Sequence, residues 1–261
     1  TVLDELAASP EPLSFTDLVK RLGMPKSSLY GLCTTLLDLH LIRKLENGSF
    51  TLGTHVMGWA NAFLSQLDLT QEFFAAWDDM RVLPEETITL SILDGEDVVY
   101  IACRNGTRPL GFTFRAGMRL PAVYTATGKA MLSTLPGSEL EQALNHPWPE
   151  PLTVHGPRNK DELMMELNDV QRLGYSVDAC GVRDGMHCFG AAVFDSNNRA
   201  AVAGVAAFLI VPLGPVGVHG PLLLAAFAGF TAGEAEGLRR AMSRKRSEAA
   251  MRSYERKFID G

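Results

Sequence analysis

The chain has 261 residues, 46% of them hydrophobic and 21% charged, which is the composition of an ordinary folded protein with enough length for two domains. Its net charge of −6 excludes a uniformly basic nucleic-acid-binding surface, so DNA binding would require positive charge that is clustered locally. The four cysteines lack C-x-x-C spacing, which argues against a disulfide scaffold and a zinc knuckle and favours the reducing cytoplasm.

The N-terminal segment predicts a short amphipathic helix. Val2, Leu3, Leu6 and Ala7 share one apolar stripe, and the helix is expected to end near Pro10. No basic region precedes an apolar stretch, so we expect no signal peptide, whereas a chain that begins at Thr1 indicates residues upstream.

The next two helices are expected to form a helix-turn-helix. Ser14 can cap the first of them, with Asp17 three residues later as a shorter capping-box acid, and Gly23 is a natural end. The second helix is expected from about Pro25 to Leu39. Its predicted buried residues are Leu29, Leu32, Cys33, Leu36 and Leu37. Two short helices joined by a glycine-containing turn are typical of a DNA-binding motif.

A basic β-hairpin comes next, with strands at 42–45 and 49–52 around the turn Asn47-Gly48. Three helices and this hairpin predict a winged helix, and the start of the recognition helix is the part that enters the major groove. The residues expected to contact double-stranded operator DNA are Thr16, Lys26, Ser27, Ser28, Tyr30, Thr34, Arg43 and Lys44. A winged helix used for protein contact is the less favoured alternative, because Arg43 and Lys44 lie on the wing.

Positive charge is sparse in this region, since residues 1–53 hold five Lys or Arg against six acids. Affinity for DNA is therefore expected to depend on dimerisation and on a few well-placed contacts with the DNA. Apolar residues then repeat at helical spacing from Thr54 to Leu69. This segment is either a linker helix that packs against a second copy of itself or a core helix of the next domain.

The rest of the chain predicts an antiparallel α+β domain of the sensor type. Alternating apolar residues and turn residues between them indicate strands at 87–93, 97–102, 110–114, 188–194 and 200–208. Helices are expected at 125–135, at 161–173 and from Thr231 onward, and a polar turn at 195–198. The apolar run at 200–213 contains Gly204 and Pro212, and it is too short to span a membrane.

Three blocks in the right order resemble the IclR-type bacterial regulators. The first is the stretch from Leu22 to Ser28, the second joins residues 117–121 to residues 125–130, and the third joins residues 174–178 to Cys188 and residues 191–195. The resemblance implies an N-terminal winged helix-turn-helix, a linker helix and a GAF-like antiparallel effector domain. The boundaries so implied are 1–53, 54–72 and 73–261.

The family implies a repressor or activator that acts as a dimer or tetramer on operators near metabolic genes, without a cofactor, metal or membrane partner. Its usual effectors are small organic acids or aromatic catabolites. Carried over by position, the effector site would comprise Phe112, Leu120, Ala126, Thr127, Gly128, Asp178, Met186 and Cys188.

The residues support an acid at this place. A helix that opens at Thr125 directs backbone N–H groups and the positive end of its dipole toward one spot, where a carboxylate would bind. Asp178 could accept a hydrogen bond from a hydroxyl at the other end of the ligand, or it could cap a turn. Cys188 is expected to be a small apolar wall. Lys129 is expected to be a solvated surface lysine.

The chain departs from the family pattern at two places. Gly31 stands where many relatives carry an arginine after the tyrosine, which removes a DNA contact and weakens the helix by about 1 kcal/mol relative to alanine. Residues 205–209 are apolar where relatives often show serines. With Phe112 and Met186, this wall favours an aromatic or hydrophobic acid, and a small polar acid is the alternative.

An enzyme is the main rival class. His187 stands beside Cys188, but neighbours on a strand point to opposite faces, so His187 cannot activate that thiol. The other histidines lack metal-binding spacing, and the glycine-rich stretches match no nucleotide-binding pattern. A DNA-binding protein without a ligand would not need the large second domain. We therefore expect a regulator and not an enzyme.

Overall fold

The computed structural model describes residues 1–65, 70, 73–74, 87–107, 113–194 and 200–209, with backbone alone for 193, 194 and 200–209. The chain divides into two units, Thr1–Asp68 and Leu69–Gly261. Each unit has a hydrophobic core of its own.

The first unit is a winged helix built from α1 (Val2–Ala8), α2 (Phe15–Leu22), α3 (Lys26–Asp38), β1 (Ile42–Lys44) and β2 (Phe50–Leu52). Its core consists of Val2, Leu6, Leu13, Leu18, Leu29, Cys33, Ile42 and Phe50. The elements carry the end signals that the sequence predicts. Ser14 and Asp17 form a reciprocal capping box at the start of α2, and Gly23 ends that helix in the left-handed region at a φ of 62°.

The helix α3 differs in one detail from its predicted pattern. Leu29 and Cys33 are buried as expected, and Leu36 and Leu37 are half-buried, but Leu32 is 38% exposed. The buried stripe of α3 follows i, i+4 and i+7 spacing, and Leu32, at i+3, lies at the margin of this stripe.

The hairpin loop is longer than the predicted three-residue connection 46–48, which contained the Asn47-Gly48 turn. Lys44 pairs with Phe50, so five residues connect the strands. Only Gly48 of the Asn47-Gly48 pair has a positive φ, whereas the mirror-image turn needs two such residues. The Asn47 side chain instead accepts a hydrogen bond from the backbone N–H of Ser49 at 3.0 Å. The loop is therefore held by a side-chain turn.

The helix α4 (His55–Ser65) follows the wing and has no buried residue. Met57, Trp59 and Phe63 are 61%, 55% and 48% exposed. Trp59 and Phe63 share one side of this helix and Met57 lies on another, and none of the three is buried by the described residues. The choice between a linker helix and a core helix of the next domain stays a prediction.

The second unit contains a six-stranded antiparallel sheet in the order β5-β4-β3-β8-β7-β6. The strands are β3 (Thr87–Asp94), β4 (Asp97–Arg104), β5 (Arg119–Pro121), β6 (Ser176–Ala179), β7 (His187–Phe194) and β8 (Ala200–Leu209). Most of these match predicted strands within one or two residues. The sequence did not predict β5 or β6 as strands, because they are short and lie next to glycines.

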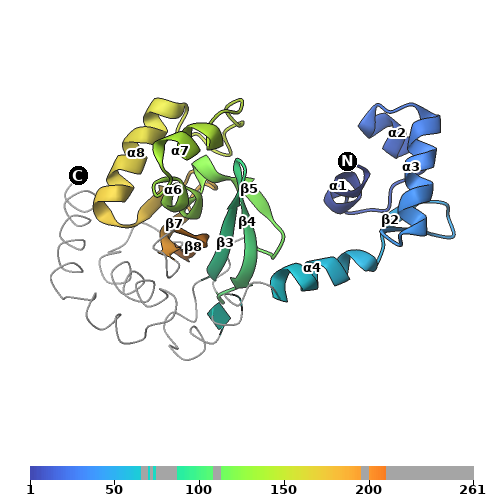
Figure 1. Cartoon of the computed structure of the whole chain (residues 1–261), viewed down its shortest axis with the longest axis horizontal. Helices are drawn as coiled ribbons and strands as arrows, with labels where there is room; N and C mark the ends of the chain where they lie inside the picture. The colour runs from blue at the N-terminus through green and yellow to red at the C-terminus, as the bar shows by residue number, and fades with distance from the viewer. Residues whose placement is uncertain (66–69, 71–72, 75–86, 108–112, 195–199, 210–261) are drawn as a thin grey trace. The chain divides into compact units, whose positions relative to one another are not determined.

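Helices cover one face of this sheet (Figure 1). They are the single turn η1 (Ala122–Tyr124), α6 (Ala126–Leu132), α7 (Gly137–Ala143) and α8 (Lys160–Leu173). The helix α6 packs against β6, β7 and β8 on one side and against α8 on the other. The core of this unit, to which the sheet and all of these helices contribute, comprises Val98, Tyr100, Phe114, Ala122, Val123, Tyr124, Ala126, Met131, Leu132, Leu140, Leu163, Leu167, Met186 and Cys188.

Some predicted elements are wrong or lie outside the described residues. The predicted strand at 110–114 is outside them up to residue 112, and Thr113 and Phe114 are not in a strand. The turn at 195–198 and the helix from Thr231 also lie outside them. The helix α7 was not predicted. Within the described chain, no helix has the length and hydropathy that a membrane crossing requires.

Candidate functional site

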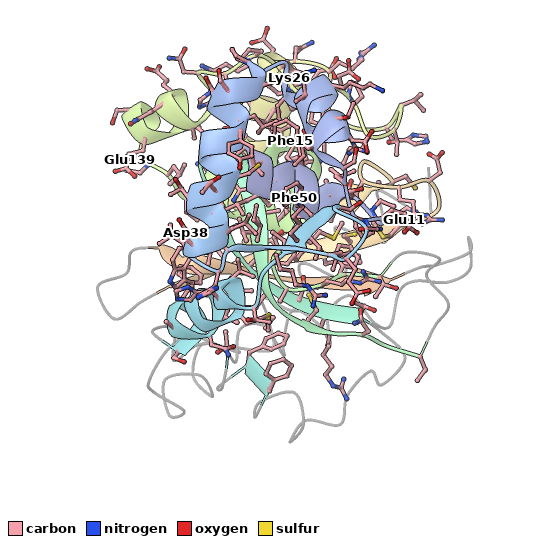
Figure 2. The ribbon with its side chains drawn as sticks, turned by 90° about the vertical axis from the view of Figure 1, so that its right-hand side faces the viewer. Glu11, Phe15, Lys26, Asp38, Phe50 and Glu139 are labelled. Carbon is pink, nitrogen blue, oxygen red and sulfur yellow. The ribbon has the colours of Figure 1, made fainter. Side chains whose placement is uncertain are left out.

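The N-terminal turn of α3 presents a polar surface. Lys26, Ser27 and Ser28 are exposed, whereas Leu29 is fully buried. Figure 2 shows Lys26 at the start of this helix. This arrangement follows from the sequence, because the buried residues recur at helical spacing and leave the polar ones outward. The start of α3 can therefore reach a partner while its other face holds the three helices together.

Aromatic contacts fix two of the other predicted DNA-binding residues. The Tyr30 ring meets the Phe15 ring edge-on with centroids 6.4 Å apart, and Tyr30 remains 69% exposed. On the wing, the Lys44 ammonium lies 5.9 Å from the centre of the Phe50 ring. These contacts restrict where a phenol hydroxyl and an ammonium group can point.

The remaining predicted DNA-binding residues are also on the surface. Thr16 on α2 and Arg43 on β1 are exposed. Thr34 is exposed, but its hydroxyl donates to the Tyr30 carbonyl oxygen at 3.0 Å, so it is less available to DNA than predicted. Gly31 faces open space, and a side chain there would meet no neighbour within 4 Å.

In the second unit, the predicted effector residues converge beneath α6. Ala126, Met186 and Cys188 belong to one buried cluster, and Leu120 packs against it. Asp178 pairs with Cys188 across β6 and β7, so both side chains lie on the same face of the sheet. Phe112 and the side chains of residues 205–209 lie outside the described residues.

Gly128 has a packing role in this structure. A Cβ at this position would overlap the backbone of Ala122, so only glycine allows α6 to approach η1 so closely. Its N–H donates to the Thr125 hydroxyl at 3.0 Å. The prediction that this N–H faces a ligand is therefore wrong.

Two buried hydroxyls beneath α6 have no hydrogen-bond partner among the described residues. They belong to Thr127 on α6 and Thr89 on β3, and both residues are 0% exposed. Thr89 shares a sheet face with Ser91, which pairs with Tyr100 of the cluster. Unpartnered polar groups in a protein interior are costly, so each requires an explanation, such as a ligand that is bound in the working state.

An aromatic pair accompanies these hydroxyls. The Tyr100 and Phe114 rings have centroids 5.1 Å apart, and both residues are buried. Burial raises the pKa of Tyr100 well above its usual value, and the nearby Thr127 hydroxyl opposes this shift without making a hydrogen bond of ordinary geometry. Tyr100 thus stays a neutral phenol. The region offers apolar ring surface together with hydroxyl groups.

Asp178 caps a turn, which is one of the two roles expected for it. Its carboxylate accepts hydrogen bonds from the N–H groups of Gly181 at 2.7 Å and Val182 at 3.3 Å. Burial raises its pKa to about 6, although the Lys129 ammonium and these two N–H groups lower it. Asp178 therefore organises the turn after β6.

Lys129 contradicts its prediction as a solvated lysine. It is 3% exposed, and its ammonium lies 2.6 Å from the Glu166 carboxylate on α8. The only sequence signal for this ion pair is the position of Lys129 on the buried face of a short helix. A buried lysine needs an acidic partner, and the sequence alone does not show which neighbouring element supplies it.

The thiol of Cys188 is not set up as a nucleophile. Burial raises its pKa well above the usual value, so it stays protonated. His187 contacts a different thiol, with its Nε2 3.7 Å from Sγ of Cys180. Among the described residues, no group of three or more potential ligands could hold a metal ion.

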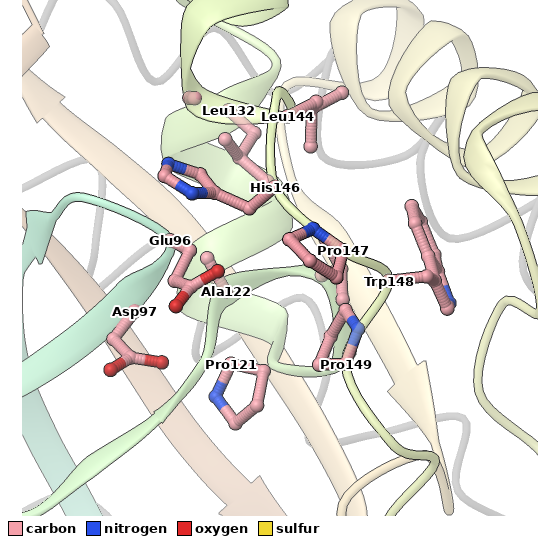
Figure 3. A pocket seen from close by; sticks show the side chains of 12 residues that line it. Glu96, Asp97, Pro121, Ala122, Leu132, Leu144, His146, Pro147, Trp148 and Pro149 are labelled. Carbon is pink, nitrogen blue, oxygen red and sulfur yellow. The ribbon is translucent and has the colours of Figure 1, made fainter.

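A cavity of about 340 Å³ lies elsewhere in this unit (Figure 3). It is lined by Glu96, Asp97, Pro121, Ala122, Val123, Leu132, Ala143, Leu144, His146, Pro147, Trp148 and Pro149. None of the predicted effector residues lines it, and no sequence motif pointed to it.

Two family models match the chain. One, described as the C-terminal domain of the bacterial transcriptional regulator IclR, matches residues 61–208. The other, described as the IclR helix-turn-helix domain, matches residues 1–46. The match to the first model covers more than half of the chain.

Individual regulators and solved structures are also similar to this chain over most of its length. The HTH-type transcriptional regulator XynR of Escherichia coli K12 is 28% identical over 203 residues, which cover 77% of this chain and 81% of XynR. The crystal structure of the repressor BlcR of Agobacterium tumefaciens is 36% identical, has a TM-score of 0.55 and covers 96% of this chain and 93% of BlcR. An IclR homologue of Microbacterium hydrocarbonoxydans, solved in complex with 4-hydroxybenzoate, shares the fold with a TM-score of 0.70 and 16% identity, over 97% of this chain and 96% of that one.

Proposed function

The chain belongs to the IclR family of bacterial transcriptional regulators, and we propose that it binds operator DNA through α3 and the wing under the control of a small organic acid. The observation that carries the DNA-binding part is the start of α3, where Lys26, Ser27 and Ser28 project outward from a buried Leu29. A cation and two hydroxyls at the start of a recognition helix suit phosphate and base-edge contacts. Such a protein acts in the cytoplasm, where its DNA is.

The experiment for this part is a DNA-binding titration at several salt concentrations. Lys26→Ala should weaken operator binding and lower the slope of log K against log salt by about one unit, if Lys26 neutralises one phosphate. Lys160→Ala, an exposed lysine at the start of α8, is the matched control and should change neither quantity. An unchanged slope for Lys26→Ala would remove this residue from the phosphate interface.

We place the effector beneath α6, between the Tyr100–Phe114 pair and Cys188. The hydroxyls of Thr127 and Thr89 could pair there with a carboxylate or hydroxyl of the ligand, because neither makes a hydrogen bond of ordinary geometry within the described residues, although the Tyr100 phenol lies near Thr127. Ring surface from Tyr100 and Phe114 supports an aromatic or otherwise hydrophobic acid. A structural neighbour with this fold holds 4-hydroxybenzoate, which shows that the fold can accept such a ligand.

A small polar acid is the second candidate effector. The hydroxyls of Thr89 and Thr127 favour it, since they would pair with a compact carboxylate as well as with an aromatic one. The two candidates differ in the apolar area that they bury, and therefore in the heat-capacity change of binding.

Self-association is part of the proposal. Apolar side chains of α4 are exposed in the single chain, with Trp59 and Phe63 on one side of the helix and Met57 on another. Pairing of two such helices in a dimer or tetramer would cover such side chains and set the distance between two wings. The effector would then shift the population between arrangements that space the wings differently.

A gel-shift titration separates the possible functions. Operator DNA is bound first without ligand, and then with 4-hydroxybenzoate, benzoate or glyoxylate as probes. A regulator of aromatic acids responds to the first two probes, and a regulator of small polar acids responds to glyoxylate. Operator binding that ignores all organic acids indicates a ligand-independent DNA-binding protein, and an enzyme with no regulatory role does not bind the operator. Thermal shift with a wider panel of acids identifies the effector, because a ligand of the native state raises the midpoint.

A further inference from the structure

We propose that the cavity in Figure 3 is a second small-molecule site, which binds an organic amine with an apolar body. Its volume of about 340 Å³ is in the range of sites for small ligands. We call it the Trp148 cavity. The proposal does not depend on the effector site beneath α6.

The inner part of the Trp148 cavity is apolar. Ala122, Val123 and Leu132 are buried there, and Pro121, Pro147 and Pro149 contribute rigid rings nearer the opening. Burying an aromatic or aliphatic group against this surface is favourable by about 25 cal/mol for each Å² removed from water.

Hydrogen bonds hold the walls in place without a ligand. The Tyr124 hydroxyl donates to the Pro149 carbonyl oxygen at 2.6 Å, which ties the segment at 147–149 to η1. The Trp148 indole N–H donates to the Pro157 carbonyl oxygen at 3.2 Å, which fixes its ring. A cavity that is already shaped loses little conformational entropy when it binds a ligand.

The opening of the cavity carries negative charge. Figure 3 shows the Glu96 and Asp97 carboxylates there, with the His146 imidazole across from Glu96. Arg119 does not neutralise Glu96, because its guanidinium binds Asp94 at 2.7 Å and Asp97 at 3.1 Å. Within the described residues, the Glu96 carboxylate has neither a hydrogen bond nor an ion pair.

This combination selects the ligand class. An apolar interior beneath a free carboxylate complements a molecule with a hydrophobic body and one ammonium group, and it opposes an organic acid of the same size. The Trp148 cavity therefore has the opposite charge preference from the site proposed beneath α6. The single turn η1 connects the two proposed sites: its residues Ala122 and Val123 line the Trp148 cavity, and it comes directly before Thr125 and α6 in the chain.

Calorimetric titration of the full chain with 2-phenylethylamine tests the proposal, with phenylacetate and 2-phenylethanol as size-matched controls. We expect saturable binding of the amine, weaker binding of the neutral alcohol and weakest binding of the acid. Equal binding of all three would overturn the charge argument, and no saturable binding of the amine would overturn the site.

Variants locate the binding. Glu96→Gln should weaken amine binding by about three- to tenfold, the range for a partly exposed ion pair, and leave 2-phenylethanol binding unchanged. Glu139→Gln, an exposed acid on α7 outside the cavity, should leave amine binding unchanged. Ala143→Phe should block both amine and alcohol by filling the cavity. Amine binding that survives both Glu96→Gln and Ala143→Phe would overturn the assignment.

Thr127→Val separates this site from the effector site. It should leave the amine affinity as it is, because Thr127 does not line the Trp148 cavity. If the amine affinity falls with Thr127→Val, the amine binds beneath α6 and the second site is refuted. The test of the amine site therefore does not depend on the outcome of the organic-acid titrations.

Discussion

The Lys129 ammonium lies 2.6 Å from the Glu166 carboxylate, and the two side chains differ sharply in exposure, at 4% and 39%. The pair joins α6 to α8 at the edge of the proposed effector site. Both charges also reach Asp178: the Lys129 ammonium lowers the pKa of that carboxyl against the effect of burial, and the Glu166 carboxylate raises it. The charge balance beneath α6 therefore involves three side chains from α6, α8 and β6.

This asymmetry predicts unequal costs for removing the two partners. Glu166→Gln leaves an ammonium buried without its counter-ion and should lower the free energy of unfolding by about 3 kcal/mol. Lys129→Met leaves a carboxylate that can reach water and places a straight apolar chain in the space, so about 1 kcal/mol is expected. Urea unfolding at neutral pH measures both. A larger loss for Lys129→Met than for Glu166→Gln would contradict this account.

The raised pKa of Asp178 predicts a pH dependence of stability. Its folded-state pKa is about 6 and its ordinary value 3.8, so the folded state binds this proton more tightly than the unfolded state does. The contribution to stability is therefore full below about pH 4 and falls as pH rises to about 6, by about 3 kcal/mol in total. Above that pH it is constant.

Asp178→Asn isolates this effect, because asparagine does not titrate and its Oδ1 can still accept from Gly181. The free energy of unfolding of the wild type relative to the variant should fall between pH 4 and pH 6.5 and then stay level. Other acids titrate equally in both proteins, so their effects cancel. A difference that does not change with pH would show that Asp178 has an ordinary pKa.

The sequence predicted the winged helix well because each of its signals is local. The Ser14–Asp17 capping box, Gly23 at the end of α2 and the apolar stripe through Leu29 and Cys33 all act within a few residues. The hairpin loop was less predictable, since an Asn-Gly pair occurs both in short turns and in longer hairpin loops, and the pair alone does not set the loop length.

The second unit was less predictable where its features depend on tertiary contacts. Lys129 is buried because α8 brings Glu166 to it from 37 positions away, and no local pattern contains that information. Asp178 accepts from Gly181, and the sequence offered this turn-capping role only as one of two alternatives. The Trp148 cavity likewise forms between segments that are distant in the chain.

The unpartnered hydroxyls predict an effector-specific variant. Thr127→Val keeps the side-chain shape and removes the hydroxyl, so it should not reduce folding stability, and it should weaken the bound acid about tenfold through the lost hydrogen bond. Operator binding without ligand should be unchanged. Calorimetry with the identified acid, together with a gel shift, checks both.

Ser133→Ala is the control for this variant. It also removes a buried hydroxyl from the same helical segment, but this hydroxyl already donates to the Ala130 carbonyl oxygen at 2.7 Å. We expect little effect of Ser133→Ala on acid affinity. If Thr127→Val binds the acid like the wild type, the Thr127 hydroxyl does not contact the ligand.

Gly31 offers a gain-of-function prediction. It lies inside α3 with open space around it, so Gly31→Ala should raise the free energy of unfolding by up to about 1 kcal/mol without changing DNA affinity. Gly31→Arg should gain similar stability and also strengthen DNA binding, with a salt slope steeper by about one unit. Equal DNA affinity of the alanine and arginine variants would place this face of α3 away from phosphates.

The exposed side of α4 predicts how the protein associates. Trp59 is 55% exposed, and its ring contact within the chain is with His55, at a centroid distance of 5.2 Å. Trp59→Ser should therefore leave the fold of one chain intact, while raising the dissociation constant of the dimer at least tenfold, since buried tryptophans carry much of the energy of interfaces. Met165→Ser is the control, because Met165 is 64% exposed on α8.

Sedimentation across a concentration series measures the association, and DNA binding should weaken in parallel because a single wing has few positive charges. If Trp59→Ser associates like the wild type, α4 is not the dimer contact.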